Sequence, residues 1–347
     1  MAVPADVNQT VFQRTPATAI PMQQEALRPG QWSKIPLPER YAFLENRKSH
    51  WDGSPSSVIM RAAKLDTPER RETELEGLWQ QGGFSFWTSN YIDLFTDAES
   101  NSLVYNFWKR KVRSRIRAQE LQEILAPDNP LYAFGTKRVP LEQGYYEAFN
   151  FPHVSLVDLG KDEVMKVDGR TIKLGSETSI DLDVLIFATG FDISTGSFTQ
   201  IDIRGKSDQI LAEKWAERPR SYLGISVAGF PNMLFPYGPQ SPSNTCNGPV
   251  CAEVQGEFIV GVLEYAKKNG HDTCEASVDA EASYTDAVTS LLQGTLFEGT
   301  KSYYHRDNVT AQQGRKREPI FWMGGLPAYI QKLGECKDNG YVGFNLS

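Results

Sequence analysis

The sequence predicts an α/β fold. The clearest strand is an apolar run from Val184 to Phe187 that leads directly into Ala188-Thr189-Gly190, which is typical of a buried strand ending in a turn. Helices are predicted where apolar residues recur every three or four positions. With 347 residues, 40% of them apolar and 23% charged, the chain has the size of two domains and the composition of a soluble globular protein.

The amino-terminal part is expected to begin with a strand. Residues 10–21 (TVFQRTPATAIP) fit a short buried strand followed by a proline-bounded turn, whereas residues 22–57 show no clear period. A helix is then expected over residues 68–81, because Thr67 is a favoured N-cap residue and a proline occupies the first helical position. Gly82-Gly83 is expected to end this helix.

A second helix is expected to begin at Thr96, where Thr96 and Glu99 have the spacing of a capping box. Its other faces carry a basic run from Lys109 to Arg117, which we interpret as a solvated face, or as one that docks an acidic neighbour, rather than as a nucleic-acid surface. The apolar residues of this segment fall four apart, which predicts a buried stripe. The stripe comprises Val104, Trp108, Val112 and Ile116.

From about Leu131 the pattern becomes strand-like. Asp168-Gly169 is a hairpin signal between two short apolar segments. Towards the carboxyl terminus, apolar residues recur at helical spacing again. The expected strands are 154–158, 164–167, 171–174, 183–188, 221–228 and 233–237, and the expected helices are 254–270, built on Val254, Phe258, Ile259, Val262, Leu263 and Ala266, and 280–292.

Charge and composition exclude several classes of protein. The 43 acidic residues outnumber the 36 basic ones, which argues against nucleic acid or an anionic membrane as the main partner. No apolar run approaches the roughly 18 residues that span a bilayer, and the first residues do not have the pattern of a signal peptide. Cys246 and Cys251 have no second ligand pair or nearby histidine, so no metal site is expected. We expect a cytoplasmic protein.

Several segments, taken in order, resemble the Baeyer–Villiger monooxygenases, which are class B flavoprotein monooxygenases. The resemblance extends from about Thr10 to Phe344 and implies an FAD- and NADP-dependent enzyme that inserts oxygen beside a ketone. The matching segments are VFQRTP (11–16), LWQQGGFSFW (78–87), TKRVPLEQGYYEAFN (136–150), DVLIFATGFD (183–192), FWMGGLPAY (321–329) and GYVGF (340–344).

The resemblance implies a division of the chain into remnants of two Rossmann-like dinucleotide-binding domains with a helical insertion. Residues 1–21 and 131–180 would form part of the NADP domain, and residues 22–130 the insertion. Residues 181–347 would form part of the FAD domain, together with the carboxyl-terminal helices.

The resemblance also implies a binding site for NADPH. Arg14 and Thr15 would contact its 2′-phosphate, joined by Lys137. This set is chemically sound, because a guanidinium fork, a hydroxyl and an ammonium together can satisfy the phosphate oxygens. Arg138 would be the catalytic residue, since a fixed positive charge can stabilise the negative charge that develops during oxygen insertion.

Two further groups of residues follow from the resemblance. The edge of the FAD site would comprise Thr189, Gly190, Phe191 and Asp192. The ketone pocket would be lined by Ser243, Asn244, Thr245 and Cys246, together with Tyr303 and His305 from the segment KSYYHRDN (301–308). In this segment the family usually carries a tryptophan where Tyr303 stands here, which puts its closure over NADP in doubt.

One departure from the family is large. Each dinucleotide-binding domain of the family opens with a G-x-G-x-x-G turn that faces the pyrophosphate, and no such motif occurs in this sequence. The chain therefore resembles only the carboxyl-terminal portion of the family. FAD would rest almost wholly on the missing portion.

Three hypotheses about function follow. In the first, the chain performs Baeyer–Villiger oxidation in secondary metabolism when an FAD-domain half completes it. In the second, it is a flavin-independent cyclase, isomerase or hydratase acting on a polyketide- or terpenoid-like intermediate. In the third, it is a non-catalytic scaffold subunit. A buried strand cut off from its sheet exposes apolar surface. We therefore expect self-association, pairing with an FAD-domain half, or repacking of the remaining segments.

Overall fold

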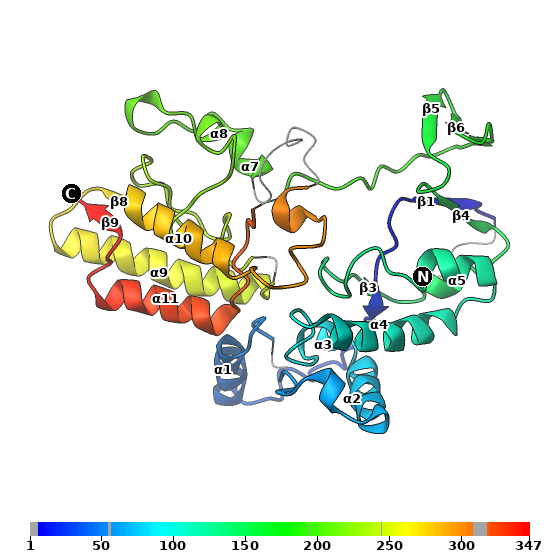
Figure 1. Cartoon of the computed structure of the whole chain (residues 1–347). Coiled ribbons are helices and arrows are strands. Elements are labelled where there is room, and N and C mark those ends of the chain that lie inside the picture. Colours follow the sequence, from blue (N-terminus) through cyan, green and yellow to red (C-terminus); the bar gives the residue numbers. More distant parts are fainter. Residues whose placement is uncertain (1–5, 55–56, 194, 244, 308–317) are drawn as a thin grey trace. The chain divides into compact units, whose positions relative to one another are not determined.

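The computed structural model describes residues 6–54, 57–193, 195–243, 245–307 and 318–347 (Figure 1). The chain forms two compact units. Unit 1 comprises Met1–Ala26 and Val58–Thr189, and unit 2 comprises Leu27–Ser57 and Gly190–Ser347. These units are defined by packing, whereas the domains expected from the sequence are defined by family resemblance. The expected domain division therefore stays a prediction.

The first long helix of unit 1 confirms its local sequence signals. Helix α2 spans Pro68–Gln81, and the Thr67 hydroxyl accepts a hydrogen bond from the Arg70 amide at 3.3 Å. Gly82, with a φ of +71°, ends the helix in a conformation that favours glycine.

Helix α4 spans Ala98–Arg113, and its predicted start was wrong by one residue. Asp97, not Thr96, is the N-cap, because its carboxylate accepts the Ser100 amide at 2.9 Å. The predicted stripe is confirmed, since all four of its members are buried. Short elements complete the helical part: η2 (Ala63–Leu65), α3 (Ser85–Thr88), α5 (Gln119–Leu125) and α6 (Tyr145–Ala148).

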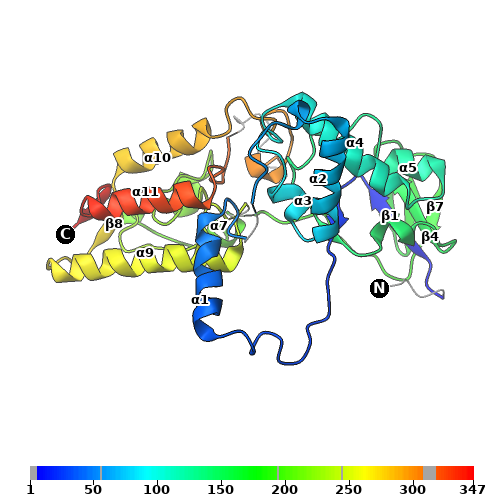
Figure 2. The same ribbon diagram turned by 90° about the horizontal axis from the view of Figure 1, so that it is seen from below.

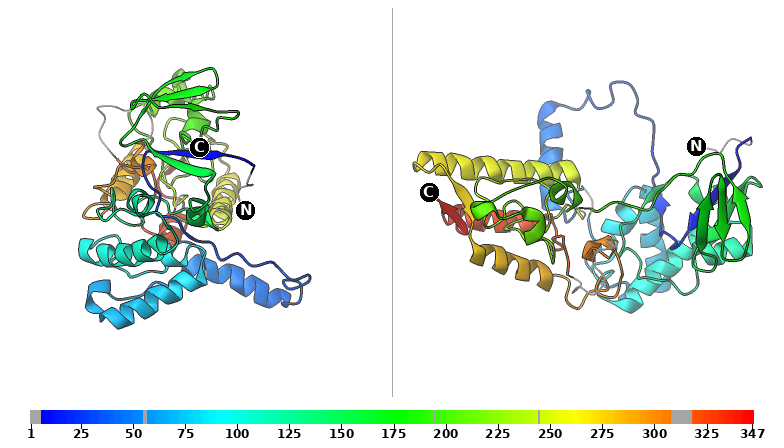
Figure 3. Two further views of the ribbon diagram at one scale, coloured as in Figure 1. Left: turned by 90° about the vertical axis from the view of Figure 1, so that its right-hand side faces the viewer. Right: turned by 90° about the horizontal axis from the view of Figure 1, so that it is seen from above.

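The strands of unit 1 form two parallel pairs and a small antiparallel sheet. β1 (Gln9–Gln13) pairs with β4 (Val154–Asp158), and β2 (Ile20–Pro21) pairs with β3 (Leu141–Glu142). The predicted hairpin is confirmed and gains a third strand (Figure 3). Its strands are β5 (Val164–Asp168), β6 (Thr171–Leu174) and β7 (Ser179–Asp181).

The predicted strand at residues 183–188 was wrong. This segment is irregular and is drawn without an arrow in Figure 1. Val184, Ile186 and Phe187 are 73%, 82% and 76% exposed. A strand of this composition needs hydrogen-bonded neighbours and covered faces, and the described residues supply neither.

Unit 2 is built mainly on three helices around a shared core (Figures 1 and 2). They are α9 (Gly248–Lys268), α10 (Val278–Ser290) and α11 (Leu326–Asp338), and β8 (Cys274–Ala276) pairs with β9 (Phe344–Leu346). Both predicted helices are confirmed, although Leu263 is exposed rather than buried. The smaller elements are η1 (Arg47–Ser49), α7 (Gly196–Thr199), η3 (Lys206–Asp208), α8 (Leu211–Lys214) and η4 (Tyr303–His305).

Two features of unit 2 differ from expectation. Helix α1 (Leu37–Asn46) lies where no period was found, because none of its residues is buried and it therefore has no apolar stripe facing a core. The strands expected at 221–228 and 233–237 are reduced to isolated bridges. Leu223 and Gly224 have φ values of +57° and +67°, which turn the chain out of an extended path.

Arg115 forms a polar link between three segments of unit 1. Its guanidinium donates to Glu142 at 2.7 Å and to Glu147 at 2.5 Å, which ties the segment after α4 to β3 and α6. The Glu142 side chain is only 4% exposed. The hydrogen bonds from Arg115 hold the pKa of the Glu147 carboxyl below its ordinary value.

The described residues contain no helix with the length and apolar character needed to cross a bilayer.

Replacing Arg115 by methionine is expected to lower the free energy of unfolding by about 2–3 kcal/mol at pH 7, because a buried carboxylate loses its partner. The pKa of Glu147 is lowered in the folded state, so its contribution is fully present above about pH 4.3, the ordinary pKa of a glutamate. It is lost as the pH falls through the lower folded-state pKa. The difference between wild type and Arg115→Met should therefore shrink in acid. Urea unfolding at pH 7 and pH 3 measures it. Arg110→Met, at a salt bridge whose two side chains are more than half exposed, is the matched control and should change stability by less than about 0.5 kcal/mol. Equal losses of unfolding free energy in Arg115→Met and Arg110→Met would contradict the stabilising role given to Arg115.

Candidate functional site

Three aromatic side chains hold the segment that follows β1. The Tyr132 hydroxyl donates to the Pro16 carbonyl at 2.9 Å and accepts from the Thr18 amide at 3.2 Å. The indole of Trp108 donates to the Ala19 carbonyl at 2.8 Å. The Tyr146 hydroxyl accepts from the Ala19 amide at 3.2 Å and donates to the Ala17 carbonyl at 3.2 Å. These bonds fix the backbone directly after Arg14 and Thr15.

Lys137 lies against the same tyrosine. Its ammonium nitrogen is 4.7 Å from the centre of the Tyr132 ring, within the range of a cation–π interaction. Tyr132 therefore connects Lys137 to the Arg14–Thr15 turn. Arg14 is exposed at the carboxyl end of β1 and makes no hydrogen bond or ion pair with the residues that the structure describes. Ligands commonly bind at this end of parallel strands.

Arg138 lies on an aromatic surface formed by Phe84 and Trp87. Its guanidinium carbon is 5.1 Å and 5.8 Å from the centres of the two rings. Trp87 also donates to the Gly135 carbonyl at 3.0 Å. Gly135 has a φ of +78°, and a Cβ there would lie 2.9 Å from the Trp87 ring. The glycine is therefore required for the turn that presents Arg138, whose side chain remains exposed.

The residues expected at the edge of an FAD site are not assembled into a cradle. Thr189, Gly190 and Asp192 lie on an exposed irregular segment, and Phe191 is 85% exposed. Gly190 has a φ of +96°, a conformation that favours glycine, but the chain does not form the expected turn at residues 188–192. The Asp192 carboxylate accepts a hydrogen bond from the Thr195 hydroxyl at 2.8 Å. In this arrangement these residues do not fit FAD.

The residues expected to line a ketone pocket are mostly buried in unit 2. Ser243, Thr245 and Cys246 are all buried, and the Thr245 hydroxyl donates to the Trp322 carbonyl at 3.3 Å. Asn244 lies outside the described residues. In η4, Tyr303 is half-buried with its ring 6.3 Å from that of Phe321, and His305 is buried. Whether these side chains line a pocket stays a prediction.

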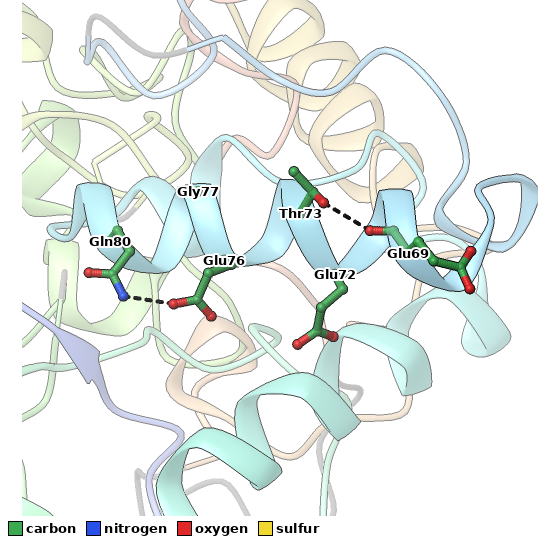
Figure 4. A pocket seen from close by; sticks show the side chains of 6 residues that line it. All are labelled: Glu69, Glu72, Thr73, Glu76, Gly77 and Gln80. Atoms are coloured by element: carbon green, nitrogen blue, oxygen red, sulfur yellow. Dashed lines mark hydrogen bonds between the residues drawn. The ribbon is translucent and has the colours of Figure 1, made fainter.

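A surface depression lies elsewhere, along α2 (Figure 4). Its lining is acidic, but two of its carboxylates are already engaged. Glu72 pairs with Arg110 at 2.6 Å and Glu76 with Lys111 at 3.0 Å, so these groups join α2 to α4. The residues that line it are Glu69, Glu72, Thr73, Glu76, Gly77 and Gln80. Within the described part of the chain, no group of acidic, histidine or cysteine side chains is arranged to hold a metal ion.

Sequence reasoning did not identify the residues that support this site. These residues are Trp87, Trp108, Tyr132 and Tyr146, and two of them, Trp87 and Trp108, are far from Lys137 and Arg138 in the sequence. The hydrogen bond between Thr18 and Tyr132 joins residues 114 positions apart, and no local pattern could show it.

Comparison with known proteins gives extensive matches. No family model matches the chain. The cyclopentanone 1,2-monooxygenase of Comamonas sp. (strain NCIMB 9872) is 39% identical over 97% of this chain and 60% of its own length. The FAD-binding monooxygenase VdtE of Byssochlamys spectabilis is 36% identical over 97% of this chain and 59% of its own length. The acetone monooxygenase (methyl acetate-forming) of Gordonia sp. (strain TY-5) is 32% identical over the whole chain and 64% of its own length.

Solved structures agree with these relatives. OTEMO in complex with FAD and NADP matches with a TM-score of 0.90 and 33% identity, covering 97% of this chain and 61% of that one. A closed structure of cyclohexanone monooxygenase matches with a TM-score of 0.89 and 30% identity, covering 97% and 62%. The fold is thus the α/β FAD/NAD(P)-binding fold expected from the sequence. Over 97% of its length the chain is homologous to the Baeyer–Villiger monooxygenases, and it spans about 60% of the length of the relatives it matches.

Proposed function

We propose that the chain binds NADPH through Arg14, Thr15 and Lys137 and takes part in oxygen insertion beside the carbonyl group of a ketone. The observation that carries this proposal is the connection through Tyr132, which brings Lys137 to the turn that holds the other two residues. Homology to enzymes named for cyclopentanone and acetone supports a ketone as the substrate class.

The chemistry of the three side chains suits a 2′-phosphate. A guanidinium offers paired N–H donors to two phosphate oxygens, and an ammonium and a hydroxyl can reach the remaining one. Arg14 is exposed and makes no ion pair with the described residues, so its charge is available to a ligand. NADH lacks the phosphate, and the site should therefore discriminate between the two nucleotides.

Arg138 is proposed as the catalytic residue. Its guanidinium is permanently charged and lies on the Phe84 and Trp87 rings, which limits its motion without neutralising it. A fixed donor of this kind stabilises an oxyanion because it requires little reorganisation when the charge forms.

FAD does not fit the residues present, since Thr189–Asp192 form an exposed segment rather than a cradle. The solved relative OTEMO contains FAD and NADP, and this chain covers 61% of it. We therefore propose that oxygen insertion requires a flavin-binding polypeptide as a partner.

The segment from Val184 to Phe187 is proposed to receive that partner. Successive side chains of a strand point to opposite faces, so Ile186 and Phe187 would lie on opposite faces, and both are more than three-quarters exposed. A strand with two apolar faces fits between two neighbours in a sheet covered on both sides. If a second copy of this chain paired with the segment edge to edge, the other edge of the strand and much of its apolar surface would stay open. A partner with an α/β fold therefore fits better.

The nucleotide proposal can be tested on the chain alone. We expect 2′,5′-ADP to bind at least about tenfold more tightly than 5′-AMP, because charge-assisted bonds to the phosphate are each worth about 1.5–3 kcal/mol. Arg14→Ala and Lys137→Ala should each reduce this preference about tenfold. Isothermal titration measures both ligands, and Arg110→Ala serves as a control on a surface arginine of the same unit. Equal affinity of the wild type for the two ligands would refute the proposed clamp.

The catalytic proposal needs the completed complex. The chain, mixed with the portion of the Comamonas enzyme that lies outside its match with this chain and with FAD, should oxidise NADPH in the presence of cyclopentanone. Arg138→Ala should lower this ketone-dependent rate about 100-fold or more, while Arg110→Ala should leave it unchanged. Absorbance at the NADPH band, with gas chromatography of the lactone, follows the reaction. An Arg138→Ala complex with the wild-type rate would rule out the role.

The pairing surface can be tested without any catalysis. Ile186→Asp and Phe187→Asp place a charge on each face and should each weaken binding of that same portion at least about tenfold. Val278→Asp, at an exposed valine that begins α10, should have no effect. Calorimetry measures affinity, and hydrogen exchange of residues 183–191 should slow in the complex. Unchanged affinity in both Asp variants would show that the partner binds elsewhere. If the two variants lost self-association of the chain instead, a second copy would be the favoured occupant of this segment.

A further inference from the structure

Tyr132 makes two kinds of contact at the proposed phosphate clamp. Its hydroxyl holds the backbone on both sides of Ala17, donating to the Pro16 carbonyl at 2.9 Å and accepting from the Thr18 amide at 3.2 Å. Its ring supports the Lys137 ammonium at 4.7 Å. One side chain therefore contacts both the backbone that follows the Arg14–Thr15 turn and the Lys137 ammonium.

We propose that Tyr132 is a positioning residue that sets the preference of this site for a ribose 2′-phosphate over a free hydroxyl. The inference rests on the proposed function, because it assumes that Arg14, Thr15 and Lys137 contact that phosphate. Tyr132 itself need not touch the nucleotide. Its effect is to hold cationic groups from two distant parts of the chain in one arrangement before the ligand arrives.

The physical argument concerns conformational freedom. A lysine side chain has many rotamers, and a ligand that orders it must overcome the entropy lost. Contact with the Tyr132 ring removes part of this freedom in advance, which leaves more of the phosphate interaction available for binding. The ring is uncharged, so this contact does not neutralise the Lys137 ammonium.

The hydroxyl acts on the other half of the clamp. Burial raises the pKa of Tyr132, so the hydroxyl stays protonated and can donate throughout the neutral range. Its donated and accepted bonds fix the residues that directly follow Arg14 and Thr15. Loss of these bonds would let the turn move relative to Lys137, and the two halves of the clamp would no longer match the spacing of the phosphate oxygens.

Two substitutions separate these contributions. Tyr132→Phe keeps the ring but removes the hydroxyl, and Tyr132→Leu removes both. We expect Tyr132→Phe to reduce the ratio of 5′-AMP to 2′,5′-ADP dissociation constants about three- to tenfold, and Tyr132→Leu to reduce it further. Affinity for 5′-AMP should change little, because that probe has no 2′-phosphate. Isothermal titration of the full chain measures both ligands, and thermal unfolding checks the fold of each variant.

Tyr145→Phe is the matched control. Tyr145 belongs to the same unit, and its hydroxyl faces the Gln13 side chain at 3.5 Å, so its removal tests the general effect of losing a tyrosine hydroxyl near β1. This variant should keep the wild-type ratio. A purely structural role of Tyr132 would instead weaken both ligands equally and leave the ratio unchanged.

A double-mutant cycle with Lys137→Met distinguishes support of the lysine from support of the turn. In the Lys137→Met background, Tyr132→Leu should cost only what Tyr132→Phe costs in the wild type, because no ammonium remains for the ring to hold. If Tyr132→Leu does not fold, the cycle of Tyr132→Phe with Lys137→Met decides, and the effects of the two substitutions on the ratio of dissociation constants should multiply.

A folded Tyr132→Leu variant with the wild-type ratio of dissociation constants would overturn this inference but not the proposed clamp. A wild type without preference would instead overturn the proposed clamp, and this inference with it.

Discussion

The arrangement of unit 1 depends on the hydrogen bonds that three aromatic side chains make with the backbone of residues 16–19. This stretch lies between β1 and β2 and has no sheet partner of its own, so its amides and carbonyls must be satisfied by side chains. Trp108, Tyr132 and Tyr146 supply these bonds while their rings contribute to the surrounding packing. The same side chains therefore form the aromatic core and hold the backbone beside Arg14. A change in the packing of this core would also change the position of the exposed Arg14.

Glycine and aromatic residues play a similar role at Arg138. Trp87 approaches Gly135 so closely that no other residue fits without movement, and its indole bonds the carbonyl of that same glycine. The guanidinium then rests on rings already fixed by the core. Arg14 and Arg138 are thus exposed cations on rigid supports, which favours recognition of an anion with little loss of entropy.

Local signals were sufficient for much of the fold but not for all of it. Helix α2 and the β5–β6 hairpin were predicted because their caps and turns lie within a few residues of one another. Residues 183–188 were predicted as a strand from composition, but a strand forms only when neighbours pair with it. The loops at 221–237 contain apolar residues that are buried without a ladder. The candidate site came from family resemblance, and its supports depend on contacts between distant segments that periodicity cannot reveal.

The exposed run from Val184 to Phe191 also has a consequence for handling the protein. It is rich in branched and aromatic residues, contains no proline and has no charge, which are the features of segments that stack into cross-β fibrils. Asp183 and Asp192 bracket it on both sides. In a parallel stack these carboxylates would recur every 4.8 Å or so and repel one another, so they act as gatekeepers against fibril growth. Because salt screens that repulsion, concentrated stocks should be kept at low ionic strength.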